Sequence, residues 1–181
     1  MNDMRTSMGY LAKAENIIKR LLNGGDLLPV EGSDDEVCKM LDLTCGIDYF
    51  HVYNNGLTWG VASRMQYNCD TGWNTFTVRT ERESGAKTEF EKRKFAIQHG
   101  GEYPFLTMQG YFDKNENVIS LGIAKTIDVM DCVDKGVGYY QHTKNDKIGQ
   151  AKFYVIPWEN MIKSGYKVLV YNAGNYISKG W

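Results

Sequence analysis

Basic side chains gather in the segment 79–94, where they are the most direct candidates for chemistry. The segment holds more Lys and Arg than Asp and Glu, whereas the whole chain carries a formal net charge of −1. Its basic residues are Arg79, Arg82, Lys87, Lys92, Arg93 and Lys94, and its acidic residues are Glu81, Glu83, Glu89 and Glu91. Guanidinium and ammonium groups form strong, charge-assisted hydrogen bonds to phosphate oxygens. The segment therefore indicates a local phosphate-binding surface.

The turn at residues 84–88 leads into a predicted helix. Thr88 and Glu91 have the spacing of a capping box, which predicts a helix that begins at Thr88 and runs to about Gln98. The free N–H groups at the start of this helix, together with Lys87 and the Thr88 hydroxyl, could meet a phosphate. A solvated helix with internal ion pairs is the alternative interpretation.

The elements before this helix follow from apolar spacing and turn residues. Capping-box spacing of Ser33 and Glu36 predicts a short helix, and Asn55-Gly56 between two β-rich runs predicts a hairpin. The predicted elements are a helix over 9–23, a helix from about 33 that ends before 44, and strands over 47–53, 57–67 and 74–80. Three strands in succession are expected to form an antiparallel meander.

The second half of the chain continues the mixture of helices and strands. The predicted strands cover 105–112, 118–124, 153–156 and 166–171, and the predicted helices cover 127–133 and 157–164. A length of 181 residues suits a single domain over 1–181, and the alternation of elements gives the α/β class.

Composition excludes several classes of protein. Apolar residues make up 43% of the chain without a run long enough to span a membrane, and the first 16 residues lack the apolar core of a signal peptide. We therefore expect a cytoplasmic protein without a membrane partner. Four widely spaced Cys and three scattered His indicate neither a disulfide framework nor a zinc site. The sequence contains no Walker loop and no credible Ser or Cys triad.

The predicted order of helix, three-stranded antiparallel meander, helix and strand resembles the core of the PD-(D/E)xK nuclease superfamily, the restriction-endonuclease-like fold. The likeness covers about residues 9–112 and leaves about 113–181 as a C-terminal α/β extension. The resemblance implies a magnesium site, in which an acid on one strand and an acid-x-lysine triplet on the next hold Mg²⁺ that activates water.

Asp48 matches the leading acid of that pattern, and the resemblance makes it the expected metal ligand. On the next strand Ala62, Arg64 and Gln66 share a face, because side chains alternate along a strand. The triplet thus lacks its carboxylate, and Arg64 replaces the lysine. Arginine can bind phosphate through two N–H groups, but its high pKa makes it a poor proton acceptor.

The missing carboxylate could come from a neighbouring element, as it does in some members of the superfamily. Glu15 on the first helix and Glu89 on the Thr88 helix are the candidates. A solvated helix charge is the more usual interpretation of both glutamates, and Asp48 could equally pair with an Arg of a neighbouring strand or cap a local turn.

Two function classes follow, and the missing carboxylate favours the first. The first is a non-catalytic or weakly catalytic nuclease-fold protein that binds DNA or inhibits a CRISPR effector nuclease without a cofactor. The chain is similar in general look to type II anti-CRISPR proteins of phages and mobile elements, which implies the host cytoplasm and an effector complex as partner. The second class is an active Mg²⁺-dependent DNA endonuclease whose catalytic set would be Asp48, Arg64, Gln66 and Glu15 or Glu89. A purely structural domain and a homodimer are further possibilities.

DNA binding is expected to use the basic side chains and exposed aromatic rings. The expected DNA-binding residues are Arg64, Arg79, Arg82, Lys87, Thr88, Lys92 and Arg93. The aromatic candidates for stacking on bases or anchoring a protein partner are Trp59, Tyr67, Trp73, Tyr103, Tyr139, Tyr140 and Trp158, most of which should lie in the core.

Overall fold

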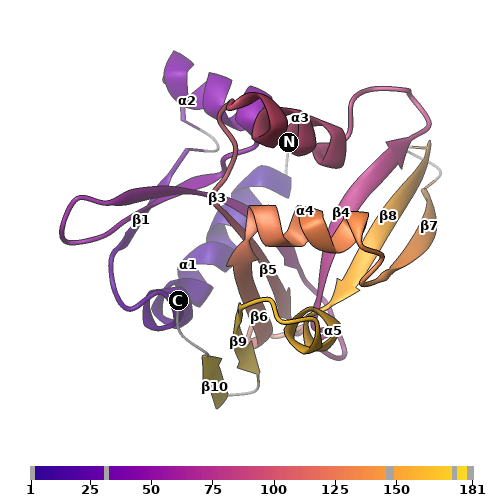
Figure 1. Cartoon of the computed structure of the whole chain (residues 1–181). Coiled ribbons are helices and arrows are strands. Elements are labelled where there is room, and N and C mark those ends of the chain that lie inside the picture. The colour runs from indigo at the N-terminus through magenta and orange to yellow at the C-terminus, as the bar shows by residue number, and fades with distance from the viewer. Residues whose placement is uncertain (1–2, 31–32, 146–148, 173–174, 179–181) are drawn as a thin grey trace.

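The chain folds as a mixed α/β structure in three layers (Figure 1). The computed structural model describes residues 3–30, 33–145, 149–172 and 175–178. A large sheet lies in the middle, and helix α1 (Asp3–Leu21) packs against one of its faces. A smaller sheet and helices α4 (Thr126–Asp134) and α5 (Trp158–Lys163) cover the other face. The expected α/β class is therefore confirmed.

The large sheet has seven strands in the order β1-β2-β3-β5-β6-β9-β10. Their bounds are β1 Asp26–Pro29, β2 Tyr49–Val52, β3 Thr58–Gln66, β5 Leu106–Phe112, β6 Val118–Lys125, β9 Val168–Asn172 and β10 Asn175–Ser178. Neighbouring strands are antiparallel except β3 and β5, which run parallel with Val61 opposite Leu106. Parallel neighbours need a crossover connection, and the intervening strand β4 and helix α3 supply it.

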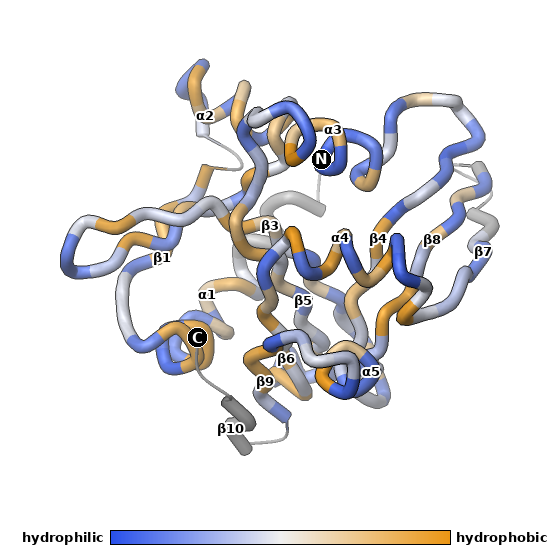
Figure 2. The backbone as a smooth tube through the Cα atoms, viewed as in Figure 1, coloured by the Kyte–Doolittle hydropathy of each residue, from blue (hydrophilic) through white to orange (hydrophobic). Residues whose placement is uncertain are grey.

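Strand β5 lies at the centre of the molecule and is buried along its whole length. Met108 belongs to the core cluster under α1, with Ile18, whereas Tyr111 belongs to the opposite cluster, with Phe76 and Trp158. Burial on both faces explains why the strand is mostly apolar. Figure 2 shows the same distribution, with hydrophobic central strands and a hydrophilic tip on the β2–β3 hairpin.

The small sheet contains β4 (Thr75–Arg82), β8 (Gly149–Pro157) and β7 (Tyr139–Asn145), antiparallel in the order β4-β8-β7. Helix α5, which follows β8, packs closely on the large sheet because β6 has a glycine at the contact. A Cβ atom on Gly122 would lie 2.4 Å from the indole of Trp158, so only glycine leaves room for this buried ring.

The predicted three-stranded meander is wrong in its third strand. Strands β2 and β3 form the expected hairpin, but β4 leaves the large sheet and pairs with β8, so that β3 pairs with β5 instead. The alternation predicted for β4 holds, since Phe76 and Val78 are buried in the core. The physical reason is that this apolar face is covered by α4 and α5, which lie later in the chain.

The structure confirms one of the two predicted capping boxes. Helix α3 (Glu89–His99) begins with the predicted capping box of Thr88 and Glu91. Helix α2 (Glu36–Met40) is capped by Asp35 rather than Ser33, because the Asp35 carboxylate accepts the N–H groups of the first turn. Helix α2 continues into a π-helical turn, η1, at Leu41–Cys45.

Strands β1, β7 and β10 were not predicted. Strand β7 lies in a polar stretch, and β1 and β10 are four-residue edge strands. Of the C-terminal α/β extension expected from residue 113 onwards, β6, β9 and β10 join the large sheet and β7 and β8 join the small sheet. Residues 146–148, 173–174 and 179–181 of that extension lie outside the described residues.

Candidate functional site

A pocket of about 210 Å³ brings several of the expected site residues together. It lies between η1, the β2–β3 hairpin and α3. Its lining residues are Asp42, Leu43, Cys45, Gly46, Asp48, Ser63, Arg64, Arg82, Glu89, Lys92 and Arg93. Asp48, Arg64 and Glu89, which are up to 41 positions apart in the sequence, therefore share one pocket, which we call the acid–arginine pocket.

Asp48 is positioned by the hairpin that follows it. Its Oδ2 accepts the backbone N–H of Ser63 at 2.5 Å, and its own N–H donates to the carbonyl of Val61 on β3. The Asp48 carboxylate thus accepts a backbone N–H from the neighbouring strand β3.

Glu89 lies between two arginines. Arg64 Nη2 donates to its Oε2 at 2.9 Å, and Arg93 Nη1 lies 2.6 Å from its Oε1 as an ion pair whose N–H is not aligned for a hydrogen bond. The Arg93 side chain is 7% exposed and that of Glu89 is 21% exposed. Burial alone would raise the pKa of the Glu89 carboxyl, but the charges of Arg93, Arg64 and Arg79 outweigh it and lower the pKa below its usual value.

A buried polar network holds Arg64 in place. Arg64 Nη1 donates to the carbonyl of Thr77 at 3.0 Å and to its hydroxyl at 2.9 Å. Gln109, which is 1% exposed, accepts both the N–H and the hydroxyl of Thr77 through Oε1, and donates through Nε2 to the Tyr111 hydroxyl. Tyr111 in turn donates to the carbonyl of Thr75. The network joins β5 to β4 and thereby fixes where the Arg64 guanidinium lies.

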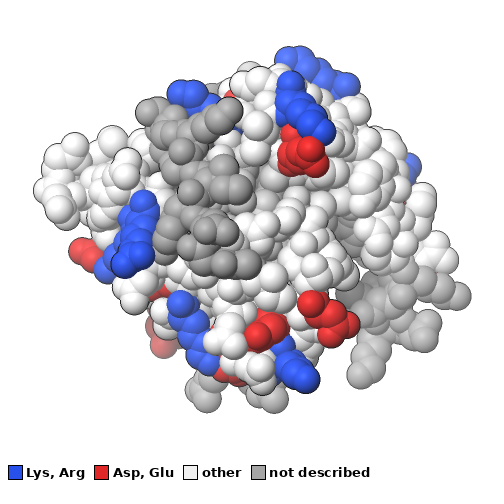
Figure 3. Space-filling view, turned by 90° about the horizontal axis from the view of Figure 1, so that it is seen from below, with Lys and Arg blue, Asp and Glu red and all other residues white. Residues whose placement is uncertain are grey.

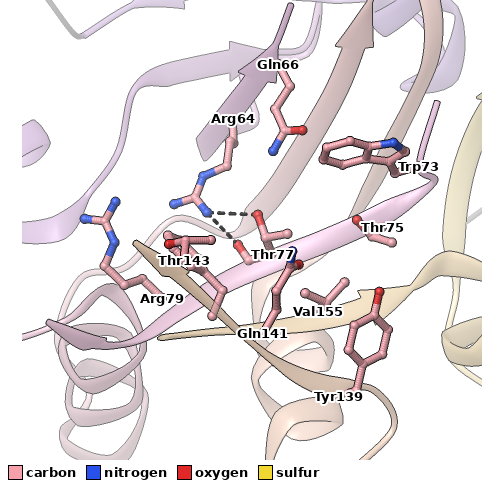
Figure 4. A pocket seen from close by; sticks show the side chains of 11 residues that line it. Arg64, Gln66, Trp73, Thr75, Thr77, Arg79, Tyr139, Gln141, Thr143 and Val155 are labelled. Atoms are coloured by element: carbon pink, nitrogen blue, oxygen red, sulfur yellow. Dashed lines mark hydrogen bonds between the residues drawn. The ribbon is translucent and has the colours of Figure 1, made fainter. Parts of the chain in front are cut away.

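A larger groove of about 790 Å³ begins on the other side of Arg64 (Figure 4). Strands β3, β4, β7 and β8 supply its walls. The lining residues are Arg64, Gln66, Trp73, Thr75, Thr77, Arg79, Tyr139, Gln141, Thr143, Phe153 and Val155. In Figure 4 the two arginines lie at one end and Trp73 and Tyr139 at the other. We call this hollow the aromatic groove; Arg64 borders both it and the acid–arginine pocket.

Most of the expected basic residues lie at these two hollows. Arg82, Lys92 and Arg93 line the acid–arginine pocket, and Arg79 lines the aromatic groove. Lys92 reaches across the pocket rim, where its Nζ donates to the carbonyl of Leu43 at 3.2 Å. The structure therefore groups side chains from β3, β4 and α3 into one basic site.

Lys87, Thr88 and Glu15 are not part of this site. Thr88 is 2% exposed, and its N–H and hydroxyl both donate to the Glu91 carboxylate, which leaves neither of these groups for a phosphate. The Lys87 ammonium lies over the ring of Phe95. The Glu15 carboxylate forms an i,i+4 ion pair with Lys19 on α1, in the layer beyond the large sheet, and it does not line the pocket.

The Asp48 and Glu89 carboxylates of this pocket are already engaged by other groups and do not form a magnesium site. Among the described residues, no group of three or more His, Cys, Asp and Glu side chains is arranged to hold a metal ion. Both oxygens of Glu89 already contact arginine, and Oδ2 of Asp48 accepts from the backbone. In this arrangement the guanidinium groups supply the positive charge that a metal would supply, so these residues do not fit Mg²⁺ as they stand.

Comparisons of the chain with protein-family models, curated proteins and solved structures find no match. None of the helices in the described ranges is both long enough and apolar enough to cross a membrane.

Several site residues were missed by sequence reasoning. Thr77 and Gln109 position Arg64, and Phe153 lies beside both Arg64 and Arg79 in the groove. Gln109 gave one usable signal, because a glutamine inside the apolar strand Leu106–Phe112 must find a buried partner. Phe153 gave no comparable signal. The prediction that most of the aromatic candidates lie in the core is wrong: Trp158 is buried, but Tyr67, Trp73, Tyr139 and Tyr140 are exposed.

Proposed function

We propose that this protein binds nucleic acid through its phosphodiester backbone and that the arginines between the two hollows make the contact. The observation that supports this most strongly is the position of Arg64. It uses three of its five N–H groups on Thr77 and Glu89, which leaves two without a partner among the described residues. Because those contacts also fix the guanidinium, it is ready to receive a phosphate oxygen without further ordering.

Crowding of positive charge supports the same proposal. Burial, followed by the charges of Arg64 and Arg82, lowers the pKa of Arg79, and the Nε of Arg79 is buried without a hydrogen-bond partner. A bound anion would relieve this repulsion. Elsewhere the charges are mixed: on the face shown in Figure 3, the described Lys and Arg side chains lie among Asp and Glu. The local site, and not the overall charge, must therefore attract the ligand.

The test is binding of labelled single-stranded and duplex DNA at several salt concentrations, in EDTA and in Mg²⁺ or Mn²⁺. Arg64→Gln should weaken binding about tenfold and reduce the salt slope by about one, since a charged hydrogen bond to phosphate is lost. Arg20→Ala, which removes an exposed arginine on α1, is the matched control and should leave binding unchanged. Binding that is equal in wild type and Arg64→Gln would contradict the proposal.

Metal-dependent cleavage is the second candidate function, and the meeting of Asp48 and Glu89 in one pocket favours it. It requires Glu89 to exchange an arginine for a metal ion. Cutting that appears only with Mg²⁺ or Mn²⁺, and that Asp48→Ala and Glu89→Gln both abolish while circular dichroism shows that both variants are folded, would establish it over binding alone. Inhibition of a CRISPR effector stays a proposal from the sequence resemblance. It is tested by adding the protein to an effector-cleavage reaction, where loss of inhibition in Arg64→Gln would connect it to this site.

A further inference from the structure

The aromatic groove differs chemically from a surface that only holds phosphates. Trp73 and Tyr139 line it and are 61% and 53% exposed, although large aromatic side chains usually lie in the core. Among the described residues, neither the side-chain amide of Gln66 nor that of Gln141, which also line the groove, forms a hydrogen bond. The groove thus offers flat apolar rings beside free donors and acceptors.

Phe153 adds a second platform at the other end of the groove. The Arg64 and Arg79 guanidinium groups lie 5.5 Å and 5.2 Å from the centre of its ring. Guanidinium planes and aromatic rings are the surfaces on which unpaired bases stack. Arg64 therefore belongs both to this platform and to the acid–arginine pocket, where a backbone phosphate would lie.

The aromatic groove also has the size of a ligand-binding site. Its volume of about 790 Å³ is within the roughly 300–1,000 Å³ range of ligand pockets. Gln66 and Trp73 also border an adjoining hollow of about 610 Å³ along residues 65–73. The three hollows thus adjoin one another at shared lining residues, so that successive nucleotides of one strand could occupy neighbouring hollows.

We infer that the aromatic groove binds unpaired nucleobases, so that the preferred ligand is single-stranded nucleic acid with its backbone at Arg64 and its bases against Trp73 and Tyr139. This inference rests on the proposed nucleic-acid binding and specifies its substrate class. A duplex keeps its bases stacked inside the helix and cannot offer them to the groove. A free nucleotide carries the same base and phosphate chemistry and is the other possible source of the ligand.

The experiment compares four ligands by fluorescence anisotropy and competition: a labelled single strand of about 12 nucleotides, the same sequence as a duplex, the same length made of abasic sites, and a free mononucleotide. Wild type should bind the single strand at least tenfold more tightly than the duplex or the abasic strand. A mononucleotide that competes as well as the single strand would identify the free nucleotide as the ligand source and would still support a base-binding groove.

Trp73→Ala should weaken binding of the base-containing single strand about tenfold and leave binding of the abasic strand unchanged. Tyr140→Ala is the matched control. Tyr140 is the next residue of β7 after Tyr139 and is 54% exposed, but it contacts Tyr154 and Lys152 and does not line the groove. Its removal should change neither affinity, and circular dichroism checks that both variants fold.

The outcomes separate the inference from the function on which it rests. Equal affinity for base-containing and abasic strands, or a Trp73→Ala effect that is the same on both, would overturn the base-binding groove while phosphate binding stands. Wild type that binds none of the four ligands would overturn both proposals.

Discussion

Replacing Glu89 by glutamine tests whether this carboxylate balances the buried arginines. The substitution keeps the shape of the side chain but leaves Arg93, which is 7% exposed, and Arg64 without their counter-charge. Removing one partner of a buried ion pair costs about 3–5 kcal/mol. Because Glu89 is 21% exposed and glutamine still offers an oxygen acceptor, we expect the lower end, about 3 kcal/mol.

Urea unfolding followed by fluorescence measures this loss. With a urea slope of about 2 kcal/mol per molar, the midpoint should fall by about 1.5 M at neutral pH. The pKa of Glu89 is lowered in the folded protein, so its stabilising contribution is complete above the ordinary value of 4.5 and is lost as the pH falls from there through the folded value. The difference between wild type and Glu89→Gln should therefore shrink in acid.

Glu102→Gln, which changes an exposed glutamate just beyond α3, is the control and should shift stability by less than about 0.5 kcal/mol. The reasoning is refuted if Glu89→Gln is as stable as this control at neutral pH. It is equally refuted if the loss stays the same from neutral pH to well below pH 4.5, because a charge-dependent contribution must titrate with its carboxyl group.

Two further predictions concern the core. Burial lowers the pKa of His51 below its ordinary value of 6.5, so the folded protein should lose stability as the pH falls from about 6.5 through the pKa of His51 in the folded state. In His51→Gln, the melting temperature should not show this decrease between neutral and acidic pH. Gly122→Ala should destabilise the protein by about 1–3 kcal/mol because its methyl group meets the Trp158 ring, whereas Gly9→Ala in α1, where nothing lies within 4 Å, should be neutral or stabilising in the same assay.

Elements governed by neighbouring residues were predictable from the sequence. The hairpin follows from Asn55-Gly56, and the start of α3 follows from the hydrogen bonds that Thr88 and Glu91 exchange over three positions. The partner of β4 was not predictable, because Phe76 pairs with Ile156, 80 positions later. An alternating strand has the same pattern in either sheet, and only the placement of α4 and α5 decides between them.

The second carboxylate shows the same limit at the level of the site. The spacing rule for an acid-x-lysine triplet considers one strand only, and there Ala62 and Gln66 supply no carboxylate. Glu89 lies on helix α3, which follows β4 after the chain has left the large sheet. The alternation of side chains along β3 therefore cannot predict that Glu89 reaches the pocket. Of its two arginine neighbours, Arg64 on β3 is separated from it in the same way, whereas Arg93 lies one helical turn further along α3. A carboxylate shared by two guanidinium groups is stable without a metal, which is why the geometry favours a phosphate-binding site over one prepared for magnesium.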